Sequence, residues 1–336
     1  MLRKIHDSCT DLLLTLLFVY LIYLLLRYPV QALDYARTGL LLWFERMIPT
    51  LLPFMILSGI MVRMNLTERF ASLFHPLFHR LFGINPNGSY VLFMGMLCGF
   101  PMGARIIGEL CAAGKLSEEE GAYLLSFCNN IGPIYFISFV MSTLSISGNI
   151  VPFLIMYGVP LFYGFTLNKI SSSIKTNNIK CSKMTLHRKP SSEKLLSAAE
   201  LPVPGATKYS PVSLPEAIDG AIMSGLKSIA ALGGYMVFFN LLNIMFLPFS
   251  ALPDSFLSLY NCLLEITSGI NRAGKDGYYM ILILLPFGGM SCIAQTYSMI
   301  RHTSLSLSQY TFHKIIQAGL TAVIYAALVF ASASVL

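Results

Sequence analysis

Long apolar blocks separated by short polar connections run through the whole chain. Eight blocks stand out, at Leu12–Leu26, Leu40–Val62, Tyr90–Ala113, Ala122–Ser142, Ile150–Leu167, Ala217–Leu247, Tyr278–Ile300 and Phe312–Leu336. A helix needs roughly 20 apolar residues to cross the hydrocarbon core of a bilayer, which is about 30 Å thick. These block lengths therefore predict an all-α polytopic membrane protein.

Composition agrees with this prediction. Of the 336 residues, 55% are apolar and only 12% are charged, whereas a soluble domain carries about 25% charged residues. A water-soluble enzyme is thereby excluded. The seven cysteines are far apart and form neither a CxxC pair nor a Cys/His cluster, so we expect neither a disulfide framework nor a metal site.

The N-terminal block has two interpretations. Arg3 and Lys4 precede it, which predicts a first spanning helix with a cytoplasmic N-terminus. The small-residue pattern at Val30–Ala32 alternatively marks the cleavage site of a signal peptide. In either case the chain emerges outside at Val30.

Four phenylalanines spaced four residues apart mark a further helix over residues 69–82. Their rings share one face, so the pattern predicts a helix lying in the membrane interface and kinked at Pro76. His75 and His79 on the same helix are the alternative, a metal pair. No third ligand is visible, and we therefore favour the interfacial helix.

Most of the net charge lies in one linker. Residues 169–215 hold eight basic and two acidic residues, which is +6 of the total +7. The positive-inside rule places this segment in the cytoplasm, and its Ser, Asn and Pro content predicts disorder. The expected organisation is a first helix and linker (1–38), a first repeat with a connecting helix (39–168), the basic linker (169–216) and a second repeat (217–336).

Two of the apolar blocks are interrupted in the middle. Gly99–Gly103 divides 90–113, and Pro286–Gly289 divides 278–300. Each half has about ten residues, too short to span a bilayer, which predicts two re-entrant helical hairpins. Residues 248–277 between the later blocks are expected to form a loop.

The two interrupted blocks also resemble each other. An ungapped alignment places Gly83–Gly88 over Gly269–Gly274 and Gly103 over Gly289. Counting spans outward from the cytoplasmic linker opens the two hairpins to opposite sides. The sequence thus predicts two inverted-topology repeats, each a broken re-entrant hairpin flanked by spanning helices, with a binding site at the midplane.

Arg105 and Glu109 are the first candidate site residues. They lie four apart within apolar sequence, where ionisable residues are expensive and face a cavity or a partner. One interpretation is an ion pair that only neutralises itself. In the other, the guanidinium binds a substrate carboxylate, assisted by the helix N-terminus after Gly103.

A second group of candidates lies at the helix interruptions. Two amides followed by Gly-Pro, at Asn129, Asn130, Gly132 and Pro133, should expose backbone carbonyls at membrane depth, with a packing kink as the alternative. In the second hairpin the corresponding candidates are Gly289, Ser291 and Gln295. Glu265, Thr267 and Lys314 are further polar candidates, of which Glu265 is expected at the interface.

No catalytic constellation is recognisable. The chain has no GxSxG, P-loop, HExxH or dinucleotide-binding motif in a suitable context. We therefore expect no enzymatic activity and no cofactor, and we leave open whether Na⁺ or H⁺ couples to the protein.

Four motifs together resemble a known family. They are Ile48–Phe54, Phe100–Arg105, Cys128–Pro133 and Leu264–Gly269. With them the chain resembles the YlbJ-type sporulation integral membrane proteins, a group with nucleoside-recognition gate domains that is similar to concentrative nucleoside transporters.

The resemblance implies a role in endospore formation, in the mother-cell membrane around the forespore, and transport of dipicolinic acid. Dipicolinate is a planar dianion, which suits an arginine fork, helix N-termini and amide donors. Expected partners are a small anionic substrate and the lipid bilayer, with no nucleic acid, and a homo-oligomer is left open. The alternatives are a nucleoside-type carrier coupled to Na⁺ or H⁺ and a non-transporting assembly factor of sporulation.

Overall fold

A computed structural model describes residues 2–182, 213–249 and 252–333. All regular elements in those ranges are helical, and six helical stretches in them are long and apolar enough to cross a membrane. These are Thr10–Arg27, Pro29–Arg63, Ile150–Ile170, Leu214–Phe246, Tyr278–Ile300 and Leu307–Ala331. The predicted all-α multi-pass membrane protein is confirmed.

The elements follow the apolar blocks closely, with extra breaks inside them. In chain order they are α1 (Leu2–Arg27), α2 (Pro29–Leu42), η1 (Trp43–Met47), α3 (Ile48–Arg63), α4 (Thr67–Ala71), α5 (His75–Phe82), α6 (Pro86–Cys98), α7 (Met102–Ala112), α8 (Glu118–Leu125), α9 (Pro133–Tyr135), η2 (Phe136–Met141), α10 (Ile150–Ser182), α11 (Leu214–Leu241), η3 (Leu242–Phe246), α12 (Asp254–Leu264), α13 (Ile266–Ala273), η4 (Gly274–Gly277), α14 (Tyr278–Leu284), α15 (Gly289–Ile300) and α16 (Leu307–Ala333).

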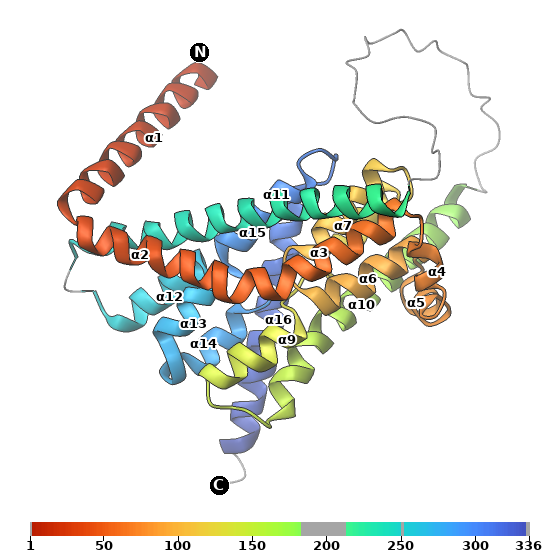
Figure 1. The fold of residues 1–336 in the computed structure, drawn as a ribbon. Coiled ribbons are helices and arrows are strands. Elements are labelled where there is room, and N and C mark those ends of the chain that lie inside the picture. Colours follow the sequence, from red (N-terminus) through yellow and green to blue (C-terminus); the bar gives the residue numbers. More distant parts are fainter. Residues whose placement is uncertain (1, 183–212, 250–251, 334–336) are drawn as a thin grey trace.

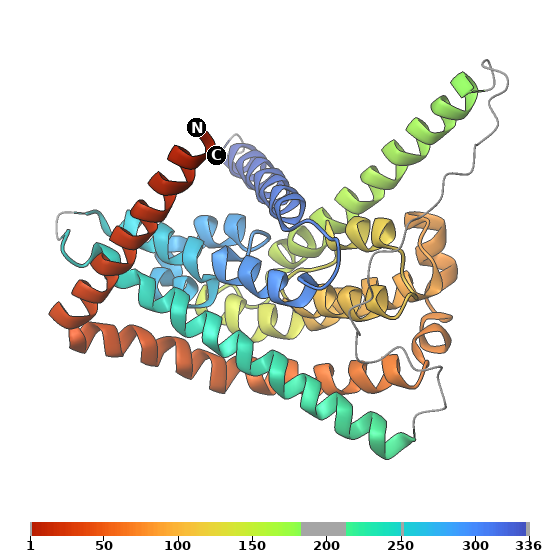
Figure 2. The same cartoon turned by 90° about the horizontal axis from the view of Figure 1, so that it is seen from above.

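Two long helical rods lie side by side along one face of the molecule. One is α2, η1 and α3 in succession, and the other is α11, which runs along both α2 and α3 (Figures 1 and 2). Small residues allow this close approach: a Cβ at Gly39 would lie 2.8 Å from the Met236 carbonyl oxygen, and one at Gly233 would lie 2.6 Å from the Trp43 ring. The Trp43 indole N–H also donates to the Ile229 carbonyl at 2.7 Å.

The first predicted hairpin is present as a packed helix pair. Helices α6 and α7 lie against each other and are joined at Gly99–Pro101. Asn85 caps the start of α6 by accepting from the Gly88 N–H at 2.6 Å. Gly99, at φ +92°, makes the turn that ends the helix.

The second hairpin-like pair is not where the sequence placed it. Residues 278–300 form α14 and α15, which do not lie side by side but continue across a break, whereas α12 and α13 pack on each other as α6 and α7 do. The predicted loop at 248–277 thus contains the helix pair. The reason is that α12 and α13 are too short and too polar to register as a span, and each is stabilised by its neighbour.

Each packed pair is followed by a broken helix whose glycine touches the pair's tip. In the first half, a Cβ at Gly132 would lie 2.8 Å from the Cys98 carbonyl oxygen. In the second half, a Cβ at Gly289 would lie 3.1 Å from the Cys262 carbonyl oxygen. The contact made by Gly132 in the first half is thus matched by that of Gly289 in the second.

The two packed pairs approach the centre of the molecule from opposite ends. In Figure 1, α6 and α7 lie on the right with α4 and α5, and α12 and α13 lie on the left, an arrangement also visible in Figure 2. Helix α16 crosses between these halves and packs on α10, α14 and α15. Residues 183–212, most of the predicted basic linker, lie outside the described residues.

The phenylalanine stripe of residues 69–82 packs on protein. The prediction of one helix kinked at Pro76 is wrong, because residues 72–74 separate α4 from α5 and Pro76 lies in the first turn of α5. Phe74 stacks on Phe93, and the buried Phe82 stacks on Phe127. The two histidines bond to Ser89 and to a backbone carbonyl, and no group of three or more metal-ligating side chains occurs in the described part of the chain.

Candidate functional site

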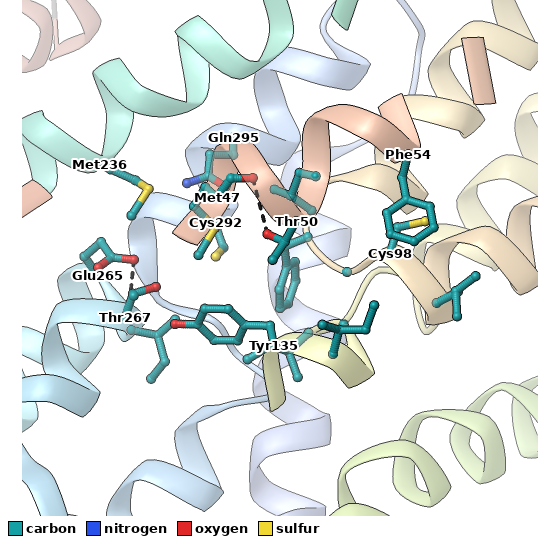
Figure 3. A pocket seen from close by; sticks show the side chains of 18 residues that line it. Met47, Thr50, Phe54, Cys98, Tyr135, Met236, Glu265, Thr267, Cys292 and Gln295 are labelled. Atoms are coloured by element: carbon teal, nitrogen blue, oxygen red, sulfur yellow. Dashed lines mark hydrogen bonds between the residues drawn. The ribbon is translucent and has the colours of Figure 1, made fainter. Parts of the chain in front are cut away.

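One cavity lies where both pair tips and both broken helices meet (Figure 3). Its walls come from η1 and α3, the tip at residues 98–100, the break at 131–135, the tip at 265–267, and helix α15, with Met236 of α11. The volume open to water-sized molecules is about 60 Å³.

The cavity has an apolar wall and a hydrogen-bonding wall. Phe54 and Phe100 with several aliphatic residues form the apolar part. The polar groups are Thr50, Tyr135, Glu265, Thr267 and Gln295. Among the residues that line it there is no Lys, Arg or His, so Glu265 is the only formal charge on this lining.

Glu265 is buried, which corrects the prediction of an interfacial position. Its side chain is 2% exposed and accepts from the N–H groups of Thr267 at 3.2 Å and Ser268 at 2.8 Å. It therefore caps α13, and the positive end of the helix dipole stabilises its carboxylate. The extended backbone of Glu265, at φ −145° and ψ 109°, forms the turn of the second tip.

Two more polar groups of this wall converge on the same space. In Figure 3 the Tyr135 side chain points toward Thr267 across the cavity. The Tyr135 hydroxyl is buried and interacts with the Thr267 side chain. Gln295 donates to Ser291 at 3.0 Å, one turn away on α15. Because Tyr135, Thr267 and Gln295 all line the cavity, they are candidate contacts for a ligand.

The amides at the first break bind protein groups behind the cavity. Asn129 accepts from the Ala104 N–H at 3.4 Å and donates to Thr296 and Tyr310, each at 3.1 Å. This side chain thereby connects the start of α7 with α15 and α16. Gly103 lies directly against it, since an added Cβ would be 3.2 Å from the Asn129 Oδ1.

Asn130 belongs to a second set of contacts centred on Lys314. The Lys314 ammonium donates to Asn130 Oδ1 at 2.7 Å and to Gln317 Oε1 at 3.4 Å. Gln317 in turn donates to the Ser126 carbonyl at 2.5 Å. All of these groups are buried, and they join α16 to the break between α8 and α9.

Arg105 and Glu109 form the predicted ion pair but do not line the cavity. The Arg105 Nε donates to Glu109 Oε1 at 2.9 Å, and an η-nitrogen donates to Ser224 of α11 at 3.0 Å. The other η-nitrogen, Nη1, is buried and has no partner in the described part of the chain. The pair therefore joins α7 to α11 outside the cavity lining.

The structure separates the sequence candidates into three groups. Four candidates line the cavity: Gly132, Glu265, Thr267 and Gln295. A second group belongs to the surrounding structure outside the lining: Gly103, Asn129, Asn130, Pro133, Gly289, Ser291 and Lys314. Arg105 with Glu109 forms the third group, the ion pair between α7 and α11. Sequence reasoning gave no role to Tyr135 and Thr50. For Glu265 a signal was available, because it lies inside Leu264–Gly269, one of the four motifs. An acidic residue in that motif marks a buried helix cap and not a surface charge.

A family model and a known protein match this chain. Residues 44–158 match the family model described as "Gate: Nucleoside recognition". The range runs from η1 into α10 and so contains the first tip and the first break. The chain is also 22% identical over 346 residues to the sporulation integral membrane protein YlbJ of Bacillus subtilis (strain 168), covering 94% of this chain and 82% of the relative. No solved structure matches.

These comparisons confirm the resemblance inferred from the four motifs. The chain is an integral, multi-pass membrane protein similar to the YlbJ protein and carries a Gate region in its first half.

Proposed function

We propose that the protein is a carrier that moves a small polar metabolite through the central cavity by alternating access. One observation supports this above all: three interruptions far apart in the sequence, at residues 99–101, 126–132 and 265, contribute to the lining of a single cavity. The fourth, at 285–288, lies against Phe100 of that lining, since a Cβ at Gly288 would be 3.0 Å from its ring. Discontinuous helices at the midplane are the usual binding site of secondary transporters, because non-helical backbone at that depth needs a cavity or protein partners.

The contacts at the two tips support a cycle of opening and closing. A tip that moves away from its broken helix would open the cavity to a metabolite. Glycines lie at both contacts, Gly132 against the first tip and Gly289 against the second. The two pairs approach from opposite ends (Figure 1), so we infer inverted repeats in which each pair opens to a different side of the membrane.

Dipicolinate is the substrate that we propose to test first. The resemblance to the YlbJ-type family suggests it, and a buried cation stands next to the cavity: Lys314 lies over the ring of Phe100, 5.1 Å from its centroid, and Phe100 lines the cavity. In a low-dielectric interior, the positive charge of Lys314 behind the Phe100 ring stabilises an anion in the cavity without direct contact. Tyr135, Thr267 and Gln295 supply hydrogen bonds to the ligand.

A second substrate class is favoured by a different observation. The cavity lining carries Glu265 and no Lys, Arg or His. Such a wall suits a neutral, hydrogen-bonding ring such as a nucleoside, whose hydroxyls and amino groups donate to a carboxylate. The two classes differ in charge, and competition experiments separate them.

The test is uptake of labelled dipicolinate into proteoliposomes that contain the purified protein, compared with protein-free liposomes. We expect uptake that unlabelled dipicolinate abolishes and that nucleosides leave unchanged. If nucleosides compete and unlabelled dipicolinate does not, the substrate belongs to the second class. If the protein takes up neither dipicolinate nor a nucleoside, the proposed carrier function is refuted. Arg105→Lys and Arg105→Ala belong in the same assay. If both variants transport as well as wild type, Arg105 serves helix packing and not substrate binding.

A further inference from the structure

Lys314 is a buried cation that has no carboxylate partner. Its side chain is 0% exposed on the spanning helix α16, about two turns after the start of that helix, and none of the ion pairs in the described part of the chain involves it. A lysine at membrane depth is expensive unless a partner compensates it. The compensation here comes from neutral groups only.

Those groups surround the ammonium as a cation cage. Asn130 Oδ1 accepts at 2.7 Å and Gln317 Oε1 at 3.4 Å. The rings of Phe100 and Tyr310 lie on other sides, with centroids 5.1 Å and 5.8 Å from the nitrogen. Amide oxygens and aromatic faces both attract positive charge, so the cage selects a cation.

The cage oxygens are oriented by further hydrogen bonds. The Asn130 amide nitrogen donates to the Phe127 carbonyl at 2.6 Å, and the Gln317 amide nitrogen donates to the Ser126 carbonyl at 2.5 Å. Each amide nitrogen thus donates to a backbone carbonyl of the broken segment, and each amide oxygen faces Lys314. The site is held in place from α16 and from the break between α8 and α9.

The cage lies where a coupling ion would be expected. In secondary transporters, unwound backbone and half-helix ends coordinate the Na⁺ that accompanies the substrate. Here the cage lies at the interruption at 126–132 and shares Phe100 with the cavity lining. The lysine ammonium fills this position, so the residues present do not fit a resident metal ion.

We propose that Lys314 is a tethered cation that takes the place of a coupling metal ion between α16, the first tip and the first break. The inference rests on the proposed carrier function and adds its ion requirement: transport proceeds without Na⁺. The ammonium connects three elements that separate when the tip moves, and its charge assists an anionic substrate.

The test uses the purified protein in detergent and needs no substrate. Thermal midpoints are measured in choline, sodium and methylammonium chloride at equal ionic strength, for wild type, Lys314→Ala, Lys314→Gln and Lys314→Arg. Lys227→Ala is the matched control, since Lys227 is exposed on the spanning helix α11. We expect a lowered midpoint in the two neutral variants and its partial recovery by sodium or methylammonium. Wild type, Lys314→Arg and Lys227→Ala should show no difference among the three salts.

Two results would overturn the proposal. One is a neutral variant that folds and shows the same midpoint in all three salts. The other is a wild-type protein that gains stability from sodium over choline. If neither neutral variant folds, dipicolinate uptake by wild type decides, because sodium dependence refutes a tethered cation and equal uptake in choline supports it.

Uptake separates this proposal from the carrier function. In choline, uptake by Lys314→Gln should fall about tenfold, the factor that corresponds to one charged interaction of about 1.4 kcal/mol, and sodium should restore part of it. Salt-specific stabilisation of the neutral variants without dipicolinate uptake by wild type would refute that substrate and leave the tethered cation standing.

Discussion

Gly132 lies where the first tip meets the broken helix that follows it, and its replacement by alanine tests how the cavity opens. The backbone at Gly132, at φ −76° and ψ 145°, is one that alanine adopts without strain. The added Cβ would however lie 2.8 Å from the Cys98 carbonyl oxygen and 3.0 Å from its carbon. Backbone atoms on both sides must then withdraw by several tenths of an ångström.

The magnitude follows from this contact. Inserting a methyl group into a packed interior costs about 1–3 kcal/mol, and here the penalty applies only while the tip touches the break. A conformation with the tip withdrawn escapes it. Gly132→Ala should therefore shift the population toward that conformation by roughly 5- to 150-fold.

Cys98 provides the assay, because it lines the cavity and is only 7% exposed. We expect N-ethylmaleimide to modify it faster in Gly132→Ala, by a factor within that range, as followed by peptide mass spectrometry. The thermal midpoint should fall at the same time. Gly158→Ala is the control, since a Cβ there meets nothing within 4 Å, and it should behave as wild type. Unchanged Cys98 modification and an unchanged midpoint in Gly132→Ala would refute a tip that opens at this contact.

Three further predictions concern single contacts. Glu265→Ala removes the cap of α13 and should destabilise the protein by about 1–2 kcal/mol, as measured by thermal or denaturant unfolding. Glu119→Ala, at an exposed position, is the control and should not destabilise it. Equal unfolding midpoints for the two variants would contradict the capping role. Burial raises the pKa of Glu120, which accepts from Asn85, above the ordinary value of 4.5. The folded protein then binds this proton more tightly than the unfolded chain, so stability should decline as pH rises from 4.5 through the raised pKa, and a Glu120→Gln variant with the same pH dependence would exclude this group. Trp43→Phe loses the hydrogen bond from the indole N–H to the Ile229 carbonyl of α11 and should lower stability by about 1 kcal/mol. An unfolding midpoint equal to that of wild type would disprove this contribution.

Local properties of the sequence were sufficient for much of the fold. Hydropathy over about 20 residues located an apolar block within each of the six candidate spans of the described residues, since crossing a bilayer depends on length and composition alone. It did not decide how each block crosses, because 278–300 was predicted as a hairpin and is a candidate span. The interruptions predicted at Gly99–Gly103, Cys128–Pro133 and Pro286–Gly289 coincide with helix breaks, because glycine and proline act on the backbone where they stand.

The packing of helices against one another decided the rest of the fold. Whether an interrupted block folds back or continues depends on what packs beside it, so the sequence assigned a hairpin to 278–300 while the packed pair is α12 with α13. The same holds for charge. Arg105 is occupied by Glu109 and Ser224, whereas Lys314 reaches the centre through its contact with Asn130, far along the chain. Glu265 caps its own helix and shares the cavity lining with residues of distant segments. The sequence by itself determined which segments enter the membrane and where they break, whereas only the tertiary structure decided which breaks meet, because that depends on contacts between segments more than a hundred residues apart.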